Sequence, residues 1–430
     1  MKRIALITAI LVLTAISFLA CGYSSSYYKP PSGLTTRVFA SQSISGPTSG
    51  ARLIIINASN DSLARASGIS AGSSPGLMAI SPERTTLLVF DSGSNGVQIV
   101  NAKTETLLGS IQLAGPTTSM VAPTSSFGYA AVPTAILNGL PLGAIQVMNL
   151  TTGGTAITIG VPNAQTVVAS PDGTELLVFS SDSDNVTLVS PFSVNTVNPV
   201  TTTVSGFDRP VNAVFGNDGK AYILNCGPEC GSASAGASVQ LLSLGATPSA
   251  GASVAVDGAT IGWVTGSTLY VAGTATVSVS NSSPNNLCTG TAAPFCGRLD
   301  IVDLGSMTVT GSAVITDGYH DRIDMSSNGQ LFIGSHTCST VGNVNAPQGE
   351  VRGCLSIFDT ATAAVVIPPD NGDVTGLQSF TGRNVEYVAE GGNLRVYDTT
   401  KDALLLNSIN PTGTIGITGQ IIDVKAVDFF

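Results

Sequence analysis

The feature that most constrains this chain is a unit that repeats along most of its length. Residues 167–191, "VVASPDGTELLVFSSDSDNVTLVSP", contain a strand, a tight turn, a strand, a loop and a further strand. Related units each hold four strand-like pieces, and the first pieces begin near Pro75, Ser119, Asn163, Arg209, Asp257, His320 and Gly372. These starting points lie 44 to 63 residues apart, and about 40 to 50 residues make one four-stranded propeller blade. The repeat therefore predicts an all-β propeller.

The two ends of the chain supply the pieces of one further blade. The segment "IIDVKAVDFF" at the C-terminus resembles a lone first strand, and "TTRVFASQS", "ARLIIINAS" and "LARASGI" near the N-terminus resemble the second, third and fourth strands. Pairing the two ends would close the ring and remove exposed sheet edges. We predict a single propeller domain of eight blades over residues 35–430. Seven blades are the alternative, because the sequence does not define the boundaries between repeats sharply.

The composition agrees with this fold and excludes one class of partner. The 430 residues include 48 Gly, and only 10% are charged, against about 25% in a typical soluble domain. Abundant Gly, Ser and Thr suit short strands and turns better than helices, because helices favour Ala, Leu, Glu, Lys and Arg. The net charge is −10 and no Lys/Arg cluster offsets it, so we expect no nucleic-acid partner.

The N-terminus has the pattern of an export signal. Lys2 and Arg3 precede an apolar run over residues 4–20, which predicts a secretory signal. The run ends in "SFLACG", which resembles a bacterial lipoprotein lipobox and implies cleavage before Cys21, lipidation of its thiol and a tether over residues 21–34. Gly22 is not the Asp that retains many lipoproteins in the inner membrane, so we expect an outer-membrane anchor facing the periplasm or the cell surface. A plain signal peptide and an uncleaved anchor helix are the alternatives.

Six cysteines remain after Cys21, and an even number in an exported chain predicts disulfides. Nearest neighbours pair as Cys226 with Cys230, Cys288 with Cys296, and Cys338 with Cys354. Zinc is the alternative at the first pair, but no Cys/His pair with ligand spacing lies nearby, and we expect no metal. All three pairs fall in long connections of consecutive blades, either to build a binding surface or to protect exposed loops.

The strand after each tight turn carries a family resemblance. The "SPDG" unit and the strands "LLVFDS", "LLVFSS", "AYILNC", "LYVAGT", "LFIGSH" and "EYVAEG" are similar to the YVTN-type β-propeller repeat over most of the mature chain. The resemblance implies the fold and leaves the function open, because its relatives include lactonase-like hydrolases, cofactor-bearing propellers and many surface proteins. Pro171 and Gly173 suit a type I turn, so we interpret Asp172 as a turn residue rather than a catalytic acid.

One group of residues has the chemistry of a candidate site. His320 lies near Asp321 and Arg322 at a corner that leads to the central channel, and Arg209 occupies the analogous corner of an earlier blade. A histidine with carboxylates and an arginine at a channel mouth suits acid/base catalysis or anion binding, and an ion-paired polar loop is the alternative. His336, the other histidine, is expected to be structural.

The acidic corner "SDSDN", residues 181–185, is a second place where a ligand is conceivable. Its alternating carboxylates suit calcium, but the Gly and the distal Glu of the EF-hand loop are missing, so we expect a polar turn. No P-loop or haem-attachment motif occurs, and we expect no cofactor.

These observations favour a monomeric cell-envelope module that binds or scaffolds a protein or a glycan without catalysis. The alternative is a lactonase-like hydrolase that uses His320, Asp321, Arg322 and Arg209. An electron-transfer propeller is disfavoured because the only candidate axial ligands are the two histidines.

Overall fold

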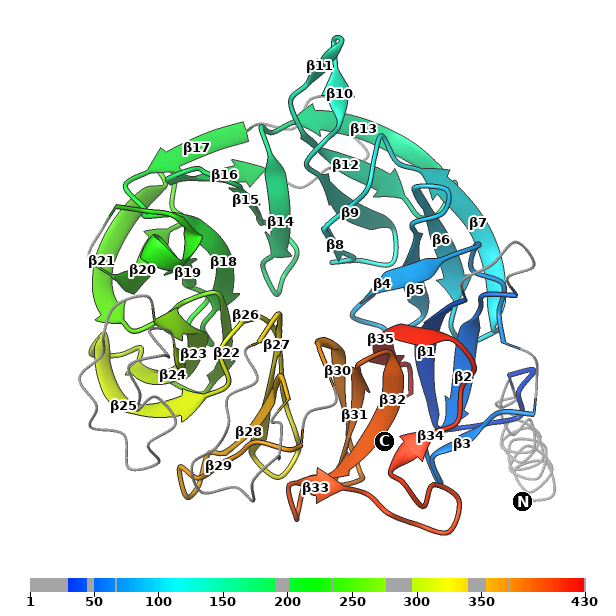
Figure 1. Cartoon of the computed structure of the whole chain (residues 1–430). Helices are drawn as coiled ribbons and strands as arrows, with labels where there is room; N and C mark the ends of the chain where they lie inside the picture. The colour runs from blue at the N-terminus through cyan, green and yellow to red at the C-terminus, as the bar shows by residue number, and fades with distance from the viewer. Residues whose placement is uncertain are drawn as a thin grey trace, which may run out of the picture.

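The computed structural model is a ring of antiparallel sheets around a central channel (Figure 1). It describes residues 30–44, 50–65, 68–189, 201–233, 236–275, 296–338, 353–369 and 372–428. The prediction of an all-β propeller with eight blades is confirmed. Within these ranges the helical structure is one short 3-10 helix, η1 (Gly227–Cys230).

Each blade is numbered in chain order and given from its innermost strand outward. Blade 1 consists of β4 (Pro75–Ile80), β5 (Thr86–Asp91), β6 (Gly96–Asn101) and β7 (Thr106–Gln112), and blade 2 consists of β8 (Ser119–Val121), β9 (Phe127–Val132), β12 (Ala144–Asn149) and β13 (Gly154–Gly160). Blade 3 consists of β14 (Ala164–Ala169), β15 (Leu176–Ser180), β16 (Asn185–Val189) and β17 (Thr201–Ser205). Blade 4 consists of β18 (Pro210–Phe215), β19 (Ala221–Asn225), β20 (Ala237–Ser243) and β21 (Ser249–Val256). Blades 5 and 6 are β22 (Ile261–Thr265), β23 (Thr268–Ala275), β24 (Cys296–Asp303), β25 (Thr308–Ile315); and β26 (Tyr319–Met325), β27 (Gln330–His336), β28 (Leu355–Asp359), β29 (Val365–Val366). Blades 7 and 8 are β30 (Val374–Phe380), β31 (Val385–Glu390), β32 (Asn393–Asp398), β33 (Ala403–Leu404), with β34 (Thr414–Ile415) paired to β32; and β35 (Gln420–Ala426), β1 (Arg37–Ser43), β2 (Leu53–Asn57), β3 (Ser62–Leu63).

The second strand of each blade is apolar on both faces because both faces are covered by neighbouring blades. In β5, Leu87 and Val89 pack toward blade 8, whereas Leu88 and Phe90 pack toward blade 2. Eight clusters of buried apolar side chains lie between the eight pairs of neighbouring blades. Alternate side chains of a strand point to opposite faces, so burial on both faces requires a continuous apolar run such as "LLVF".

The ring is closed by strands from the two ends of the chain, as predicted. β1 pairs antiparallel with β35, and Val38 lies opposite Ala426. Arg37 reinforces this seam, because its Nη1 lies 2.8 Å from Oε1 of Glu105 in blade 1 and its Nε lies 2.8 Å from Oδ2 of Asp428. The N-terminal segment is thereby tied to its neighbouring blade and to the C-terminus.

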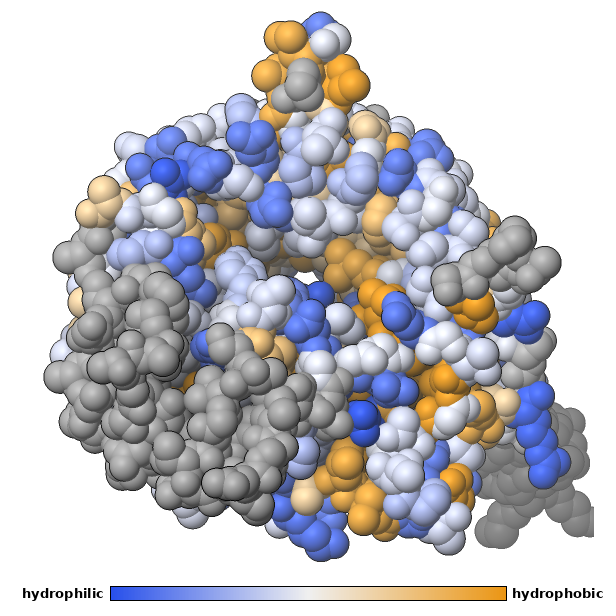
Figure 2. Space-filling model, viewed as in Figure 1, coloured by the Kyte–Doolittle hydropathy of each residue, from blue (hydrophilic) through white to orange (hydrophobic). Residues whose placement is uncertain are grey.

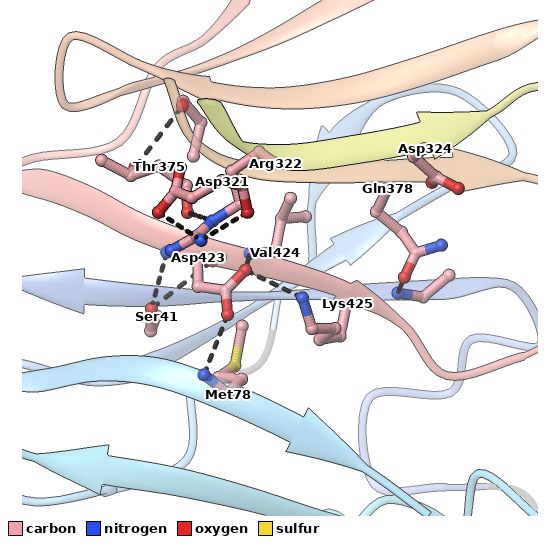
Figure 3. Close-up of polar contacts among 12 residues, drawn as sticks. Ser41, Met78, Asp321, Arg322, Asp324, Thr375, Gln378, Asp423, Val424 and Lys425 are labelled. Atoms are coloured by element: carbon pink, nitrogen blue, oxygen red, sulfur yellow. Dashed lines mark hydrogen bonds and ion pairs between the residues drawn. The ribbon is translucent and has the colours of Figure 1, made fainter. Parts of the chain in front are cut away.

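Polar side chains on the innermost strands join neighbouring blades across the channel wall (Figure 3). Asp423 Oδ2 accepts the backbone N–H of Met78 at 2.8 Å, which links blade 8 to blade 1. Gln378 Oε1 accepts the N–H of Ala426 at 3.1 Å, which links blade 7 to blade 8. These bonds satisfy backbone donors that strand pairing leaves unpaired at the centre of the ring.

The turn interpretation of "SPDG" is confirmed. Gly173 has φ of 68°, and its N–H donates to the carbonyl of Ser170 at 2.9 Å. The Asp172 carboxylate accepts the Ser170 hydroxyl at 2.6 Å and the Thr174 N–H at 3.1 Å. The hydrogen bond from Ser170 lowers the pKa of Asp172 to about 2, so this carboxylate stabilises its own turn.

Two of the three predicted disulfides, Cys226–Cys230 and Cys338–Cys354, are confirmed. The third pair includes Cys288, which lies outside the described residues, as does Cys21 with the predicted signal and lipid attachment. The fourth strand of blade 8 is shorter than predicted, because β3 spans two residues and Ile69 contributes only an isolated bridge to Leu53. In the described ranges no helix has the length and hydrophobicity needed to cross a bilayer.

Substitution of Arg37 by Ala tests the importance of the seam. The Arg37 and Glu105 side chains are only 5% and 2% exposed, so the change leaves a buried carboxylate without its cation. We expect the free energy of unfolding to fall by about 3–5 kcal/mol in chemical denaturation. Arg52→Ala removes an exposed arginine and should change the free energy by no more than about 0.5 kcal/mol. Equal effects of the two substitutions would contradict the assignment.

Candidate functional site

The candidate site is a cavity of about 220 Å³ at the mouth of the channel. It is lined by the start of β14 and of β18, the connection between β15 and β16, Cys230 and Tyr319. These elements come from blades 3, 4 and 6 and lie on the face that carries the connections between second and third strands. Figure 2 shows this face, which is hollowed at its centre.

β-Bulges at the start of the innermost strands direct side chains toward the mouth. The register shifts by one residue between Ala164 and Thr166 in blade 3 and between Pro210 and Asn212 in blade 4. The extra residues, Gln165 and Val211, both line the cavity. Blade 6 has the same shift between His320 and Arg322, so Asp321 is its bulged residue. A bulge re-aims a side chain without ending the strand, which explains why these corners meet at one place.

Arg209 is held by the acidic corner "SDSDN" of the preceding blade. Its Nη1 lies 3.3 Å from Oδ1 of Asp182 and its Nε lies 3.9 Å from Oδ1 of Asp184. Its backbone N–H also donates to Asp184 Oδ1 at 3.1 Å, and φ of Arg209 is 50°, in the left-handed region. The corner therefore positions a cation at the cavity, a contact between blades that the sequence does not reveal.

His320 lies in the interior rather than at the mouth, which corrects the predicted placement. Its side chain is fully buried, and its Nε2 lies 2.8 Å from the carbonyl oxygen of Thr316. Burial lowers the pKa of His320 to about 4. Its neighbour Tyr319 lines the cavity, whereas alternation along β26 directs the side chain of His320 into the core. A ring buried in this way contacts no ligand at the cavity.

His336, which the sequence predicted to have only a structural role, is the histidine that lies beside the site. It stands opposite Tyr319 in the β26–β27 ladder, and the two rings are stacked with centroids 6.1 Å apart. Its Nε2 lies 3.1 Å from Oδ2 of Asp321, the same oxygen that lies 2.7 Å from Nη1 of Arg322. The hydrogen bond to Asp321 raises the pKa of this half-buried histidine. The pairing register of the strands was the signal that could have identified it.

Glu229 is a second residue that the sequence reasoning missed. It lies in η1, which the Cys226–Cys230 disulfide spans, and its Oε2 accepts the N–H of Thr274 in blade 5 at 2.8 Å. Burial raises the pKa of Glu229 to about 7. It lines a second cavity of about 370 Å³ beside Asp257. An acidic residue enclosed in the short cysteine loop "CGPEC" was the available signal.

The described residues provide no metal centre. In the ranges that the structure covers, no three His, Cys, Asp or Glu side chains gather in a way that could hold an ion. The carboxylates of the corner "SDSDN" are directed at Arg209 instead. The arrangement can supply hydrogen-bond donors and acceptors, a paired cation and a histidine–carboxylate pair.

Comparison with known proteins identifies the fold of this chain but does not identify an activity. No family model matches the chain, and no curated protein matches it. Among solved structures, the dihydro-heme d1 dehydrogenase NirN is 12% identical, with a TM-score of 0.58 over 92% of this chain and 75% of that one. A candidate 6-phosphogluconolactonase from Bacteroides fragilis is 12% identical, with a TM-score of 0.52 over 91% of this chain and 98% of that one. A functionally unknown protein from Desulfotomaculum acetoxidans is 14% identical, with a TM-score of 0.51 over 78% of this chain and 99% of that one. At these identities the likeness establishes a shared β-propeller fold alone.

The two histidines of the chain allow a direct test of the site's electrostatics, because NMR titration resolves two imidazole signals. We expect His336 to titrate above 6.5 and His320 at about 4. Since the fold favours protonated His336, its contribution to stability is present below pH ~6.5 and is lost as the pH rises through its raised pKa.

The variant Asp321→Asn removes the acceptor of His336. It should lower the pKa of His336 and leave His320 near its low value, which serves as the internal control. A reversed order of the two titrations, or an unchanged His336, would contradict the geometry.

Proposed function

We propose that this protein is an exported, lipid-anchored propeller of the YVTN type that binds a glycan at the channel mouth without catalysis. The two disulfides fit an oxidising compartment outside the cytoplasm. The lipobox-like "LACG" around Cys21 supports the anchor. The observation that carries the binding proposal is the cavity itself, a hydroxyl-rich pocket with an exposed aromatic ring.

The chemistry of the lining suits sugar hydroxyls. Thr166, Ser180, Ser181 and Ser183 supply hydroxyl groups that both donate and accept hydrogen bonds, and Gln165 adds an amide. Tyr319 is about 40% exposed at the cavity and is stacked on His336, which fixes the ring in place. A fixed aromatic face covers the apolar side of a sugar ring while polar groups set its orientation.

The charge of the cavity favours an uncharged ligand over a phosphorylated one. Arg209 is the cation at the cavity, and it already lies beside the carboxylates of Asp182 and Asp184. A phosphate group would have to compete with both acidic groups for this guanidinium. A neutral glycan requires no such exchange and can use the paired Arg209 as a hydrogen-bond donor.

An array of cell-envelope oligosaccharides tests this function. We expect the full chain to bind at least one neutral oligosaccharide, and Tyr319→Ala and Arg209→Gln each to weaken that binding at least about 10-fold. Lys401→Ala, an exposed change in blade 7, should leave binding unchanged. The proposal fails if no oligosaccharide binds, or if the two cavity variants bind as the wild type does.

A second candidate function is a lactonase-like hydrolase, which the contact between His336 and Asp321 favours. A histidine oriented by a carboxylate can act as a general base, and Arg322 beside it can stabilise developing negative charge. This version keeps Asp321 and Arg322 from the sequence prediction and replaces His320 with His336 as the base.

A lactone hydrolysis assay separates the two histidines. If the protein is a hydrolase, His336→Ala should reduce kcat at least about 100-fold. His320→Ala disturbs a buried residue, so its loss of activity should follow its loss of folded protein measured by circular dichroism. No detectable hydrolysis by the wild type, or equal specific activity of folded His336→Ala, excludes this function.

A further inference from the structure

Blade 2 carries an apolar hairpin that the repeat does not require. Between its second and third strands the chain forms β10 (Ile136–Leu137) and β11 (Leu140–Pro141), which pair with each other. Figure 1 shows the hairpin projecting from the rim of the ring, and Figure 2 shows apolar residues on the sides of this projection. Ile136, Leu140 and Leu142 are 63%, 57% and 43% exposed. These three side chains therefore contribute little to the packing of the described residues.

The hairpin is a defined structure and not a loose loop. Asn138 and Gly139 form its turn with φ of 51° and 82°, the combination that a two-residue type I′ turn needs. At its base, the N–H groups of Leu142 and Gly143 both donate to the carbonyl of Ala135, at 3.1 and 3.0 Å. Leu137 packs against the apolar cluster between blades 1 and 2. The fold therefore holds the exposed side chains in a fixed, outward position.

The surrounding chain has no ionisable side chain other than a tyrosine. Residues 106–171, which include all of blade 2, contain no Asp, Glu, Lys, Arg or His, although the whole chain has a net charge of −10. Charged groups resist transfer from water to the boundary of a lipid bilayer, and carboxylates are also repelled by anionic lipids. Blade 2 is the part of the ring that can approach such a surface without either cost.

We propose that this hairpin inserts into the surface of a lipid bilayer. Its three apolar side chains expose on the order of 300 Å², which is below the roughly 800 Å² that each partner buries in a stable protein complex. The same area suffices for shallow insertion, because each apolar side chain contributes independently when it enters the headgroup and acyl boundary. The backbone pairing between β10 and β11 satisfies polar groups that would otherwise be stranded in lipid.

Quenching of tryptophan by brominated lipids tests the proposal at the residue concerned. The full chain is reconstituted with vesicles of phosphatidylethanolamine and phosphatidylglycerol, with and without brominated acyl chains. We expect the emission of Leu140→Trp, corrected for the native Trp263, to fall at least two-fold in brominated vesicles. Leu142→Trp should behave in the same way and provides a second exposed position, near the base of the hairpin.

The control is Leu406→Trp, because Leu406 is 64% exposed but lies in blade 7. It should be quenched no more than the wild type. This local signal is independent of the N-terminal anchor and of glycan binding. Equal quenching of hairpin and control variants, or no association of the wild type with vesicles, would overturn the proposal. A blue shift of the hairpin variants without quenching would also overturn it, in favour of a protein partner.

Discussion

The pairing of β1 with β35 is the constraint on which the rest of the structure depends. Every blade is apolar on both faces, so each is stable only while a neighbour covers each face. An open ring would expose the faces of blade 1 and blade 7, and the seam prevents this by building blade 8 from both ends of the chain. Asp423 extends the seam to the channel wall, because it binds the backbone of Met78 in the next blade.

A closed ring brings together groups that are remote in the sequence. The mouth combines Arg209 of blade 4, the acidic corner of blade 3 and Tyr319 of blade 6, and the bulges at the strand starts aim side chains at this place. Connections between second and third strands are free to vary because they lie outside the apolar interfaces. The disulfide-bearing loops, the acidic corner and the hairpin of blade 2 are all variants of this one connection.

The acidic corner illustrates how far sequence reasoning reaches. The residues of "SDSDN" predicted a polar turn, and the structure adds that Asp182 and Asp184 position Arg209 of the next blade. The exchange of roles between the histidines has a similar origin. Side chains along a strand alternate between the interior and the mouth. The bulge at Asp321 shifts this alternation by one residue. Propensity does not reveal where a bulge falls.

By itself, the sequence determined the strand repeat, the eight blades, the closure by the chain ends, the "SPDG" turn and the two described disulfides. These features follow from local patterns, because apolar runs, turn residues and neighbouring cysteines act over short distances. Only the tertiary structure decided which side chains share the mouth, that Glu229 is partly buried with a raised pKa, and that Leu140 remains exposed. These properties depend on whether a neighbouring blade covers each side chain, and the blades reach their final positions only when the ring closes.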